Sequence, residues 1–192
     1  MIGVGMVAVD QQDLSERLFV IVDGPPASGK TTLARPLATC LGLPLLAKDR
    51  IKDALMKVLP PPDVEASRVL GRAAVGAMLA AAVDSPLGAV LESNFYRSRA
   101  AEDLVRLPGS IVEVFCRCDR QVARSRYRLR AGTRSVGHFD DLRTDEEIWN
   151  PEICEPVAAG WPVIEVDTSQ PVDAVSVARL VRQAAAHGDP VP

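Results

Sequence analysis

The segment best suited to chemistry lies near the start of the chain and reads Gly24-Pro25-Pro26-Ala27-Ser28-Gly29-Lys30-Thr31, which fits the spacing G-x-x-x-x-G-K-[ST]. Its glycines let the backbone wrap around a phosphate and aim successive N–H groups at it. Lys30 can place a positive charge beside the β- and γ-phosphates, and the Thr31 hydroxyl can hold Mg²⁺. A helix starting at the loop adds its positive N-terminal end. The segment, with Thr32 after it, therefore predicts a binding loop for ATP or GTP.

A second candidate group is Lys48-Asp49-Arg50, which directly follows a short predicted strand at 43–47. The carboxyl ends of strands are where open α/β sheets bind ligands, so Asp49 is expected beside the phosphate-binding loop. A carboxylate there can orient a hydroxyl group and take its proton during phosphoryl transfer. The alternative is that Asp49 only caps the helix that follows.

Alternating strands and helices must position these residues. Apolar runs that end in glycine, proline or polar residues predict five buried strands at 18–23, 43–47, 89–93, 110–116 and 162–166. Helical patterns occupy the segments between and after them, at 31–41, 50–59, 64–83, 98–107, 120–131, 172–186 and part of 145–159. Pro36 lies inside the first helix, where we expect a bend or a missing hydrogen bond. This order predicts a three-layer α/β fold with a five-stranded parallel sheet.

The helix at 120–131 is unusually rich in arginine. Residues 117–134 hold seven arginines and one acid, a local charge of +6 in a chain of net charge −3. Arg126 and Arg130 share a helical face that we expect to turn inward, because it lies beside an apolar stripe. That stripe consists of Val122, Ser125 and Leu129. An outer face, which we expect to be solvated, carries Arg120, Arg124 and Arg128.

Together, these features resemble AAA-like P-loop kinases of the zeta-toxin, chloramphenicol-phosphotransferase and polynucleotide-kinase-like group, over residues 18–185. The resemblance implies a nucleoside-kinase-like fold with an arginine-rich lid at about 120–141. It implies that Asp49 accepts the proton of the acceptor hydroxyl and that Arg126 and Arg130 cover the phosphates, since guanidinium groups match phosphate oxygens. Lys30 completes the predicted catalytic set.

The third predicted strand is similar to the family's strand that carries the Walker B acid, but it departs from the pattern. Its acid is Glu92, which we expect in mid-strand, in place of an aspartate at the usual position. The resemblance then implies that Mg²⁺ is held mainly by Thr31, phosphate oxygens and water, with Glu92 or Asp49 farther out. Asn94 follows the strand and is expected at the acceptor, together with Arg50.

Two further segments match less closely. Residues 134–138 resemble the R-x-P-G-H segment after the family's lid, although Val136 replaces the proline. Arg134 and His138 are therefore expected near the acceptor, or His138 holds the lid in place or is only a surface residue. Residues 166–169 resemble the segment that packs on the nucleotide base, which would put Thr168 there. They serve equally well as a cap and turn before the last helix.

Composition limits the remaining possibilities. A chain of 192 residues with 47% hydrophobic content suits one domain, which we place at 18–186, with a flexible leader at 1–17 and a disordered tail at 187–192. The N-terminus lacks the pattern of a signal peptide, and the most apolar helical stretch, 73–83, is too short to span a bilayer. We therefore expect a cytoplasmic protein, a monomer or homodimer, without membrane partners.

The sequence predicts a kinase that uses ATP and Mg²⁺ to phosphorylate a hydroxyl of a small molecule such as a nucleoside, sugar, antibiotic or UDP-sugar. Two alternatives stay open: a nucleotide-binding regulatory ATPase, and a polynucleotide 5′-hydroxyl kinase. Nucleic acid is the less favoured acceptor, because aromatic residues for base stacking make up 4% of the chain.

Overall fold

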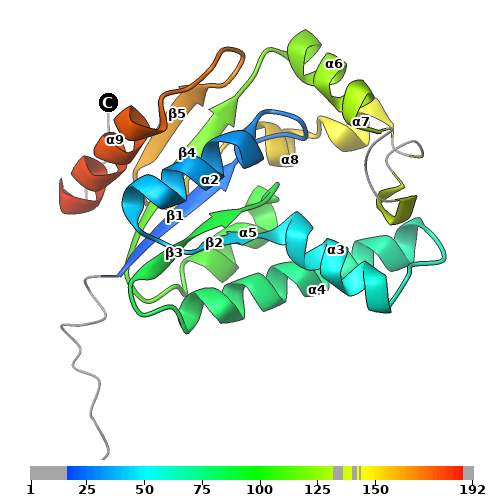
Figure 1. Cartoon of the computed structure of the whole chain (residues 1–192), viewed down its shortest axis with the longest axis horizontal. Helices are drawn as coiled ribbons and strands as arrows, with labels where there is room; N and C mark the ends of the chain where they lie inside the picture. The colour runs from blue at the N-terminus through cyan, green and yellow to red at the C-terminus, as the bar shows by residue number, and fades with distance from the viewer. Residues whose placement is uncertain (1–16, 132–135, 140–141, 143, 188–192) are drawn as a thin grey trace, which may run out of the picture.

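Five short strands form a single parallel sheet in the order β2-β3-β1-β4-β5 (Figure 1). The computed structural model describes residues 17–131, 136–139, 142 and 144–187. The strands are β1 (Leu18–Asp23), β2 (Leu45–Ala47), β3 (Gly88–Glu92), β4 (Ser110–Arg117) and β5 (Val163–Asp167). The central strand β1 pairs with β3 on one side and with β4 on the other, and its residues 19–23 are buried. Burial on both faces explains why its sequence is continuously apolar.

Helices connect the strands and cover both faces of the sheet. Those described are α2 (Lys30–Leu41), α3 (Lys48–Val58), α4 (Val64–Val83), α5 (Arg97–Leu104), α6 (Arg120–Ala131), α7 (Asp145–Ile148), α8 (Pro151–Cys154) and α9 (Ala174–His187), with a short 3₁₀ turn, η1 (Val136–His138). The predicted helices all appear, and the segment 145–159 contains two short helices, α7 and α8. The predicted α/β fold with a five-stranded parallel sheet is confirmed.

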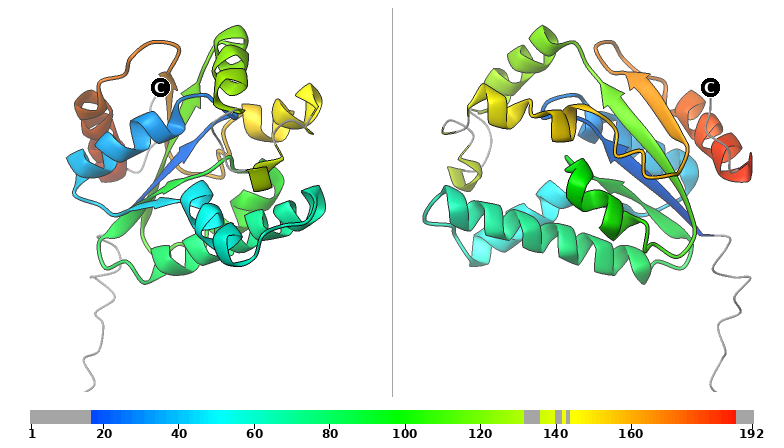
Figure 2. Two further views of the ribbon diagram at one scale, coloured as in Figure 1. Left: turned by 45° about the vertical axis from the view of Figure 1, so that its right-hand side comes forward. Right: turned by 180° about the vertical axis from the view of Figure 1, so that it is seen from behind.

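Helices lie on both faces of the sheet (Figure 2). The sheet separates two apolar cores, one on each face. On one face, α2 and α9 pack together over the sheet, with Leu37 and Val181 fully buried. On the other face, α4 and α5 pack with Met78 and Leu104 fully buried, joined by the segment that leads to Trp161. The alternating side chains of β1 supply both cores, which produces the three layers.

Two element boundaries differ from the predictions in a way that affects the site. β3 ends at Glu92, so this acid lies at the carboxyl end of the strand and not in mid-strand as predicted. The chain turns away there because the loop after β3 is bonded to Asp23. α3 begins at Lys48, two residues earlier than predicted, with Ala47 as its N-cap. Asp49 therefore lies in the first turn of α3 and does not cap it.

The predicted ends of the domain fall largely outside the described residues. The leader at 1–17 is described only at Arg17, whose Nη1 donates to the Val83 carbonyl at 2.8 Å. The predicted tail is described only at His187, the last residue of α9. Residues 132–135, 140 and 141 of the predicted lid also lie outside the description.

Helix α4 has the predicted bounds, but its apolar part extends beyond the stretch at 73–83 that the sequence suggested. Val64–Val83 forms a helix of 20 residues that is long and apolar enough to cross a membrane by length and composition. In this structure it packs along α3 and against β2 and β3, with Ala74, Met78 and Ala82 buried. These contacts are those of a helix that covers one face of a sheet.

A buried carboxylate fixes the segment between α8 and β5. Glu113 of β4 is fully buried and accepts hydrogen bonds from the backbone N–H groups of Val157 (2.7 Å) and Ala158 (2.9 Å) and from Trp161 Nε1 (2.9 Å). Ala158 has a φ of 49°, which a non-glycine residue seldom adopts. The three bonds stabilise this unusual turn and satisfy the buried carboxylate.

We predict that Glu113→Ala lowers the free energy of unfolding by about 3 to 5 kcal/mol, because it leaves three donors, two of them buried, without an acceptor. Urea denaturation followed by circular dichroism measures the effect. Glu102→Ala, at an exposed position of α5, is the control and should change stability by less than about 0.5 kcal/mol. Equal losses in the two variants would contradict this account of Glu113.

Candidate functional site

The glycine-rich loop between β1 and α2 has the backbone needed to surround an anion. Gly24 has a φ of 140°, and a Cβ at this position would lie 2.6 Å from the Cys116 carbonyl oxygen of β4. Glycine is therefore required both by conformation and by space. Ala27 and Gly29 follow with positive φ values of 61° and 92°. A backbone in which residues of positive φ are interspersed with residues of negative φ turns successive N–H groups toward one point. This forms an anion-binding nest at the start of α2.

Lys30 is buried at the base of this loop. Its Nζ donates to the carbonyl oxygens of Gly24 (2.8 Å) and Pro25 (2.7 Å). Burial lowers the pKa of Lys30, while the nearby Glu92 and Asp23 act in the opposite direction. The ammonium group is thus held at the loop by two carbonyls and two neighbouring acids.

The end of β3 brings Glu92 to the first turn of α2. Thr31 Oγ1 donates to Glu92 Oε1 at 3.1 Å, and Glu92 is only 6% exposed. Burial raises the pKa of Glu92, and Lys30 and the bond from Thr31 partly offset this. A hydroxyl and a carboxylate in contact are oxygen donors of the kind that Mg²⁺ prefers. The pair therefore fits a magnesium site, and the chain departs from the family pattern in using glutamate.

Asp23, the last residue of β1, is the most deeply buried acid of the site. Its Oδ1 accepts from the N–H groups of Gly24 (2.6 Å) and Phe95 (2.9 Å), while Oδ2 is buried without a hydrogen-bond partner among the described residues. Burial raises the pKa of Asp23 to about 7, although both N–H bonds and Lys30 lower it. One carboxyl group thus joins the phosphate-binding loop to the loop after β3.

Asp49 approaches the same region from the first turn of α3. Its Oδ1 lies 3.0 Å from Lys48 Nζ, and its side chain is 42% exposed. Asn94, after β3, is half-buried and lines the same cavity as Asp49. Arg50 is exposed and is not part of the cavity wall, so the structure does not bring it to the other predicted acceptor residues.

Helix α6 forms the opposite wall. Arg126 donates from Nη1 to the Thr168 carbonyl (2.9 Å) and from Nη2 to the Ser169 carbonyl (3.1 Å), which fixes the lid to the loop after β5. Thr168 is buried and lies beside Gly29. Arg130 also lines the cavity, and its guanidinium lies 5.9 Å from the centre of the Tyr127 ring.

The predicted apolar stripe of α6 is wrong. Leu129 is 78% exposed and Ser125 is exposed, whereas Ala123 and Tyr127 are the buried residues among positions 120–130 of the helix. Tyr127 determines the packing because its ring meets that of Trp149, after α7, at 5.9 Å in an edge-to-face arrangement. The inward face still carries Arg126 and Arg130, because both flank Tyr127.

The outer arginines of α6 are not uniformly solvated. Arg120 and Arg128 are exposed as predicted. Arg124 is only partly exposed, because it forms an ion pair with Asp145 and lies over the Trp149 ring. These contacts attach α6 to α7.

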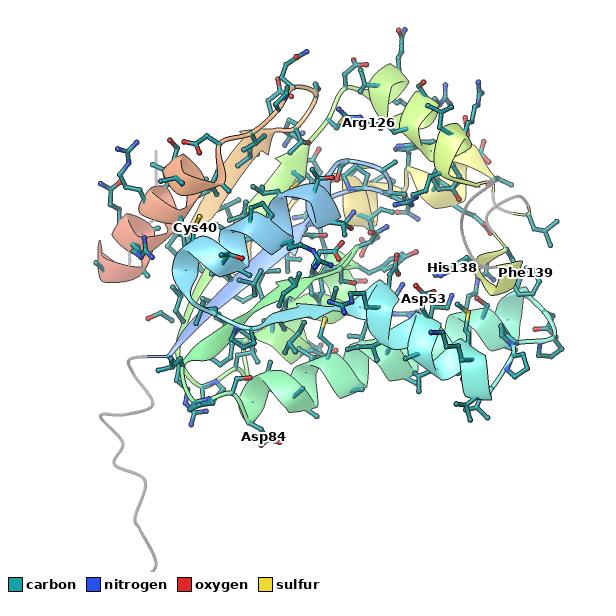
Figure 3. All side chains as sticks on the ribbon, viewed as in Figure 1. Cys40, Asp53, Asp84, Arg126, His138 and Phe139 are labelled. Carbon is teal, nitrogen blue, oxygen red and sulfur yellow. The ribbon has the colours of Figure 1, made fainter. Side chains whose placement is uncertain are left out.

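Beyond α6, η1 is attached to α3 and α4. His138 Nε2 lies 2.7 Å from Asp53 Oδ1, and the histidine is 4% exposed (Figure 3). His138 is therefore not a surface residue, and because it both lines the cavity and contacts α3, its predicted roles at the acceptor and in holding the lid stay predictions. Next to it, Lys52 Nζ donates to Ser67 Oγ at 2.6 Å, and Ser67 Oγ donates to the Gly137 carbonyl at 2.7 Å. Arg134 lies outside the described residues.

These elements enclose one cavity of about 640 Å³ between the phosphate-binding loop, α3 and α6. In Figure 1, α6 lies above the loop and the α3–α4 pair lies below it. The short η1 turn, drawn in yellow-green, lies at the right, next to α4. The predicted residues that line the cavity are Pro26, Ala27, Gly29, Lys30, Thr31, Thr32, Asp49, Asn94, Arg126, Arg130, His138 and Thr168. Gly24, Pro25 and Ser28 shape the loop from behind and are buried.

The sequence predictions missed Asp23 and Lys52 and underestimated Glu92. An acid directly before the glycine-rich loop was a visible signal for Asp23. Lys52 stands three residues after Asp49, the spacing that puts two side chains on one helical face, and this was also visible. The Thr31–Glu92 contact depends on where β3 ends, which the sequence pattern does not define.

Comparison with known proteins agrees with this geometry. The sequence profile of a family described as an AAA domain matches residues 19–151. A candidate kinase from Chloroflexus aurantiacus J-10-fl is 31% identical with a TM-score of 0.77, and the match covers 88% of this chain and 99% of that one. No curated protein matches the chain.

Two more distant structures show the same fold. Shikimate kinase from Acinetobacter baumannii, solved with shikimate, is 21% identical with a TM-score of 0.55, over 91% of this chain and 96% of that one. A sugar kinase from Janibacter sp. HTCC2649 is 20% identical with a TM-score of 0.54, over 89% and 96% of the two chains. The fold of this chain is thus shared with kinases of small molecules.

The raised pKa of Asp23 predicts a pH-dependent stability difference between the wild type and Asp23→Asn. Between pH 3.8 and about 7, the folded protein holds a proton that the unfolded chain has lost, so the stability from Asp23 is complete below pH 3.8 and is lost as the pH rises to about 7. Asparagine does not titrate. The free energy of unfolding of Asp23→Asn, minus that of the wild type, should therefore increase by up to about 4 kcal/mol as the pH rises through this window.

Urea denaturation at several pH values from 4.5 to 8 measures this difference. The exposed Asp103→Asn on α5 is the control, and its difference from the wild type should not change with pH. A pH-independent difference for Asp23→Asn would show that Asp23 does not titrate in this range.

Proposed function

The chain is a P-loop kinase that belongs to the AAA-domain family, and we propose that it uses ATP and Mg²⁺ to phosphorylate a hydroxyl group of a small molecule. The observation that carries the proposal is that the phosphate-binding loop and Asp49 line one cavity. An ATPase that uses water needs no pocket for an acceptor, and here the cavity continues past Asp49 to η1.

In the proposed reaction, the acceptor hydroxyl lies between Asp49 and the γ-phosphate of ATP. The hydroxyl oxygen forms a bond to the γ-phosphorus, and the bond from that phosphorus to the β–γ bridging oxygen breaks. The hydroxyl proton passes to the Asp49 carboxylate, and ADP leaves with the bridging oxygen. Lys48 Nζ lies 3.0 Å from Asp49 Oδ1 and places a positive charge beside the carboxylate that takes this proton.

The charge of the transferred group is balanced by the chain's own cations. Lys30 holds the β- and γ-phosphates, and the nest of N–H groups at the start of α2 supports it. Arg126 and Arg130 approach from α6, and their guanidinium groups bind the equatorial phosphate oxygens. Because Arg126 is bonded to the loop that holds Thr168, it also connects phosphate binding with the nucleotide base.

Thr31 and Glu92 would hold Mg²⁺, since their oxygens already lie 3.1 Å apart beside Lys30. When bound, the ion neutralises part of the charge on the phosphates. Burial of Glu92 raises its pKa, and a cation at this position favours its ionised form.

The acceptor occupies the part of the cavity between Asp49, Asn94, Arg130 and His138. The enzyme is proposed to act in the cytoplasm, as a monomer or a homodimer. A small acceptor is favoured over a polynucleotide because η1 is fastened to α3 across the far end of the cavity.

We predict that Asp49→Asn lowers kcat by at least about 100-fold while the Kd for ATP stays within a factor of about two, because the amide cannot accept a proton. Product formation from a panel of hydroxyl compounds, measured by ³¹P NMR, gives kcat, and calorimetry gives the Kd. Asp103→Asn is the matched control and should behave as the wild type. Unchanged turnover in Asp49→Asn would remove Asp49 as the base.

We predict that Glu92→Gln raises the Mg²⁺ concentration for half-maximal activity by about 10-fold, since the amide keeps the bond to Thr31 but loses the charge. A Mg²⁺ titration at fixed ATP measures this. Glu102→Gln, on the exposed face of α5, is the control. An unchanged Mg²⁺ requirement would place the ion away from Glu92.

A further inference from the structure

The loop that carries Asn94 to the cavity is held by the end of the central strand, which lies beside β3 (Figure 1). Ser93, the residue before Asn94, donates its N–H to the Val22 carbonyl at 3.3 Å. Phe95, the residue after it, donates its N–H to Asp23 Oδ1 at the shorter distance of 2.9 Å. The position of Asn94 therefore depends on two consecutive residues of β1.

The same carboxyl oxygen also holds the start of the phosphate-binding loop. Gly24 donates its N–H to Asp23 Oδ1 at 2.6 Å, and the Gly24 carbonyl accepts from Lys30 Nζ at 2.8 Å. Lys30 is the cation that we propose to hold the phosphates. Hydrogen bonds therefore run without interruption from the phosphate-binding lysine to the loop beside the acceptor.

The two N–H groups that meet at Asp23 belong to closely packed segments. Asp23 is fully buried, and Phe95, 3% exposed, packs in the core beneath α4 and α5. On the other side, a Cβ at Gly24 would lie 2.6 Å from the Cys116 carbonyl oxygen, so this residue has no free space behind it. Because protein interiors contain few voids, a displacement of one segment is passed to the other.

A shared oxygen also links the order of the two loops. A ligand that restricts the phosphate-binding loop restricts Gly24, and through Asp23 it restricts Phe95 as well. A second ligand that binds to a loop already ordered loses less conformational entropy, and this gives positive coupling without a large change of structure. The coupling is reciprocal, so each ligand raises the affinity for the other by the same factor.

We propose that Asp23 is a positioning residue that couples the two substrates, because nucleotide bound at the glycine-rich loop orders the loop around Asn94 and so tightens acceptor binding. The proposal rests on the proposed function, since it assigns a coupling to the same site. Asp23 touches neither substrate and acts through the backbone of Gly24 and Phe95.

Amide hydrogen exchange of the full-length protein, resolved by residue with NMR, tests the coupling without an acceptor. The probe is ADP with Mg²⁺ at saturating concentration. We expect it to slow exchange at both Gly24 and Phe95 by at least about 5-fold, the lower end of typical coupling between sites. The Ser110 amide, which is bonded to the Arg17 carbonyl at the opposite end of the sheet, is the internal control and should not respond.

Two variants of Asp23 separate positioning from stability. Asp23→Ala removes the oxygen that both N–H groups share, so ADP should no longer slow exchange at Phe95. Asp23→Asn keeps an oxygen that can accept both bonds and should restore most of the response. Asp103→Ala, at an exposed position of α5, is the control and should respond as the wild type does. The wild-type comparison with and without ADP decides the coupling even where Asp23→Ala does not fold.

Kinetics then test the consequence for the acceptor. The probe is the hydroxyl compound of the panel that gives the most product. In the wild type, its KM should fall by about 5- to 10-fold between low and saturating ATP. In Asp23→Ala, the same KM should change by less than about 2-fold, because the two loops are no longer linked.

The other outcomes overturn the coupling or the function separately. Slower exchange at Gly24 with no change at Phe95 overturns the coupling and leaves nucleotide binding intact. An equal response of Phe95 in the wild type and in Asp23→Ala removes Asp23 from the coupling. So does a response lost as completely in Asp23→Asn as in Asp23→Ala. No effect of ADP on any amide of the phosphate-binding loop, with no product from the panel, would contradict the proposed function itself.

Discussion

The cavity depends on the carboxyl group of Asp23, which ends the central strand and bonds to two loops at once. Its Oδ1 accepts the N–H of Gly24, where the phosphate-binding loop begins, and the N–H of Phe95, beyond Asn94. All strands of a parallel sheet end at the same edge, so the two loops are neighbours by topology, but topology does not fix their separation. Asp23 fixes it. The bond to Phe95 holds the loop after β3 against the end of β1, close to Glu92 at the strand end.

The same carboxyl group takes part in the electrostatics of the site. Asp23, Lys30 and Glu92 are buried within reach of one another, and burial acts against the charge of each, raising the pKa of the two acids and lowering that of the lysine. The lysine and the acids partly compensate one another. The triphosphate and Mg²⁺ that we propose to bind here would bring both negative and positive charge to this cluster, and would replace these internal interactions with stronger ones. The site is therefore arranged around a charge pattern that its ligand completes.

The sequence was most informative where one local pattern determined the structure. The glycine-rich run, the parallel strands and α4 follow from residue type and period alone, because a phosphate nest needs glycine and a buried strand needs continuous apolar residues. The inward face of α6 was harder to predict. Its arginines were placed by helical spacing, but the apolar stripe was wrong because Tyr127 packs on Trp149, a contact between residues 22 positions apart. Asp23 and Lys52 were missed for the same reason, since their contacts are with residues on other elements, which the local sequence does not show.

The far end of the cavity is fixed by polar contacts rather than by an apolar core. Asp53 lies 2.7 Å from His138, and Ser67 links Lys52 to the carbonyl of Gly137. A side chain at Gly137 would meet Met56 Sδ at 2.8 Å, so η1 lies close on α3 as well. Arg126, at the near end, is bonded to the loop after β5. One end of the cavity is therefore held by bonds from α6 to the loop after β5, and the other by bonds from η1 to α3 and α4. This arrangement limits the length of the acceptor proposed to lie between Asp49 and η1. That limit favours a compact acceptor for the reaction proposed at Asp49.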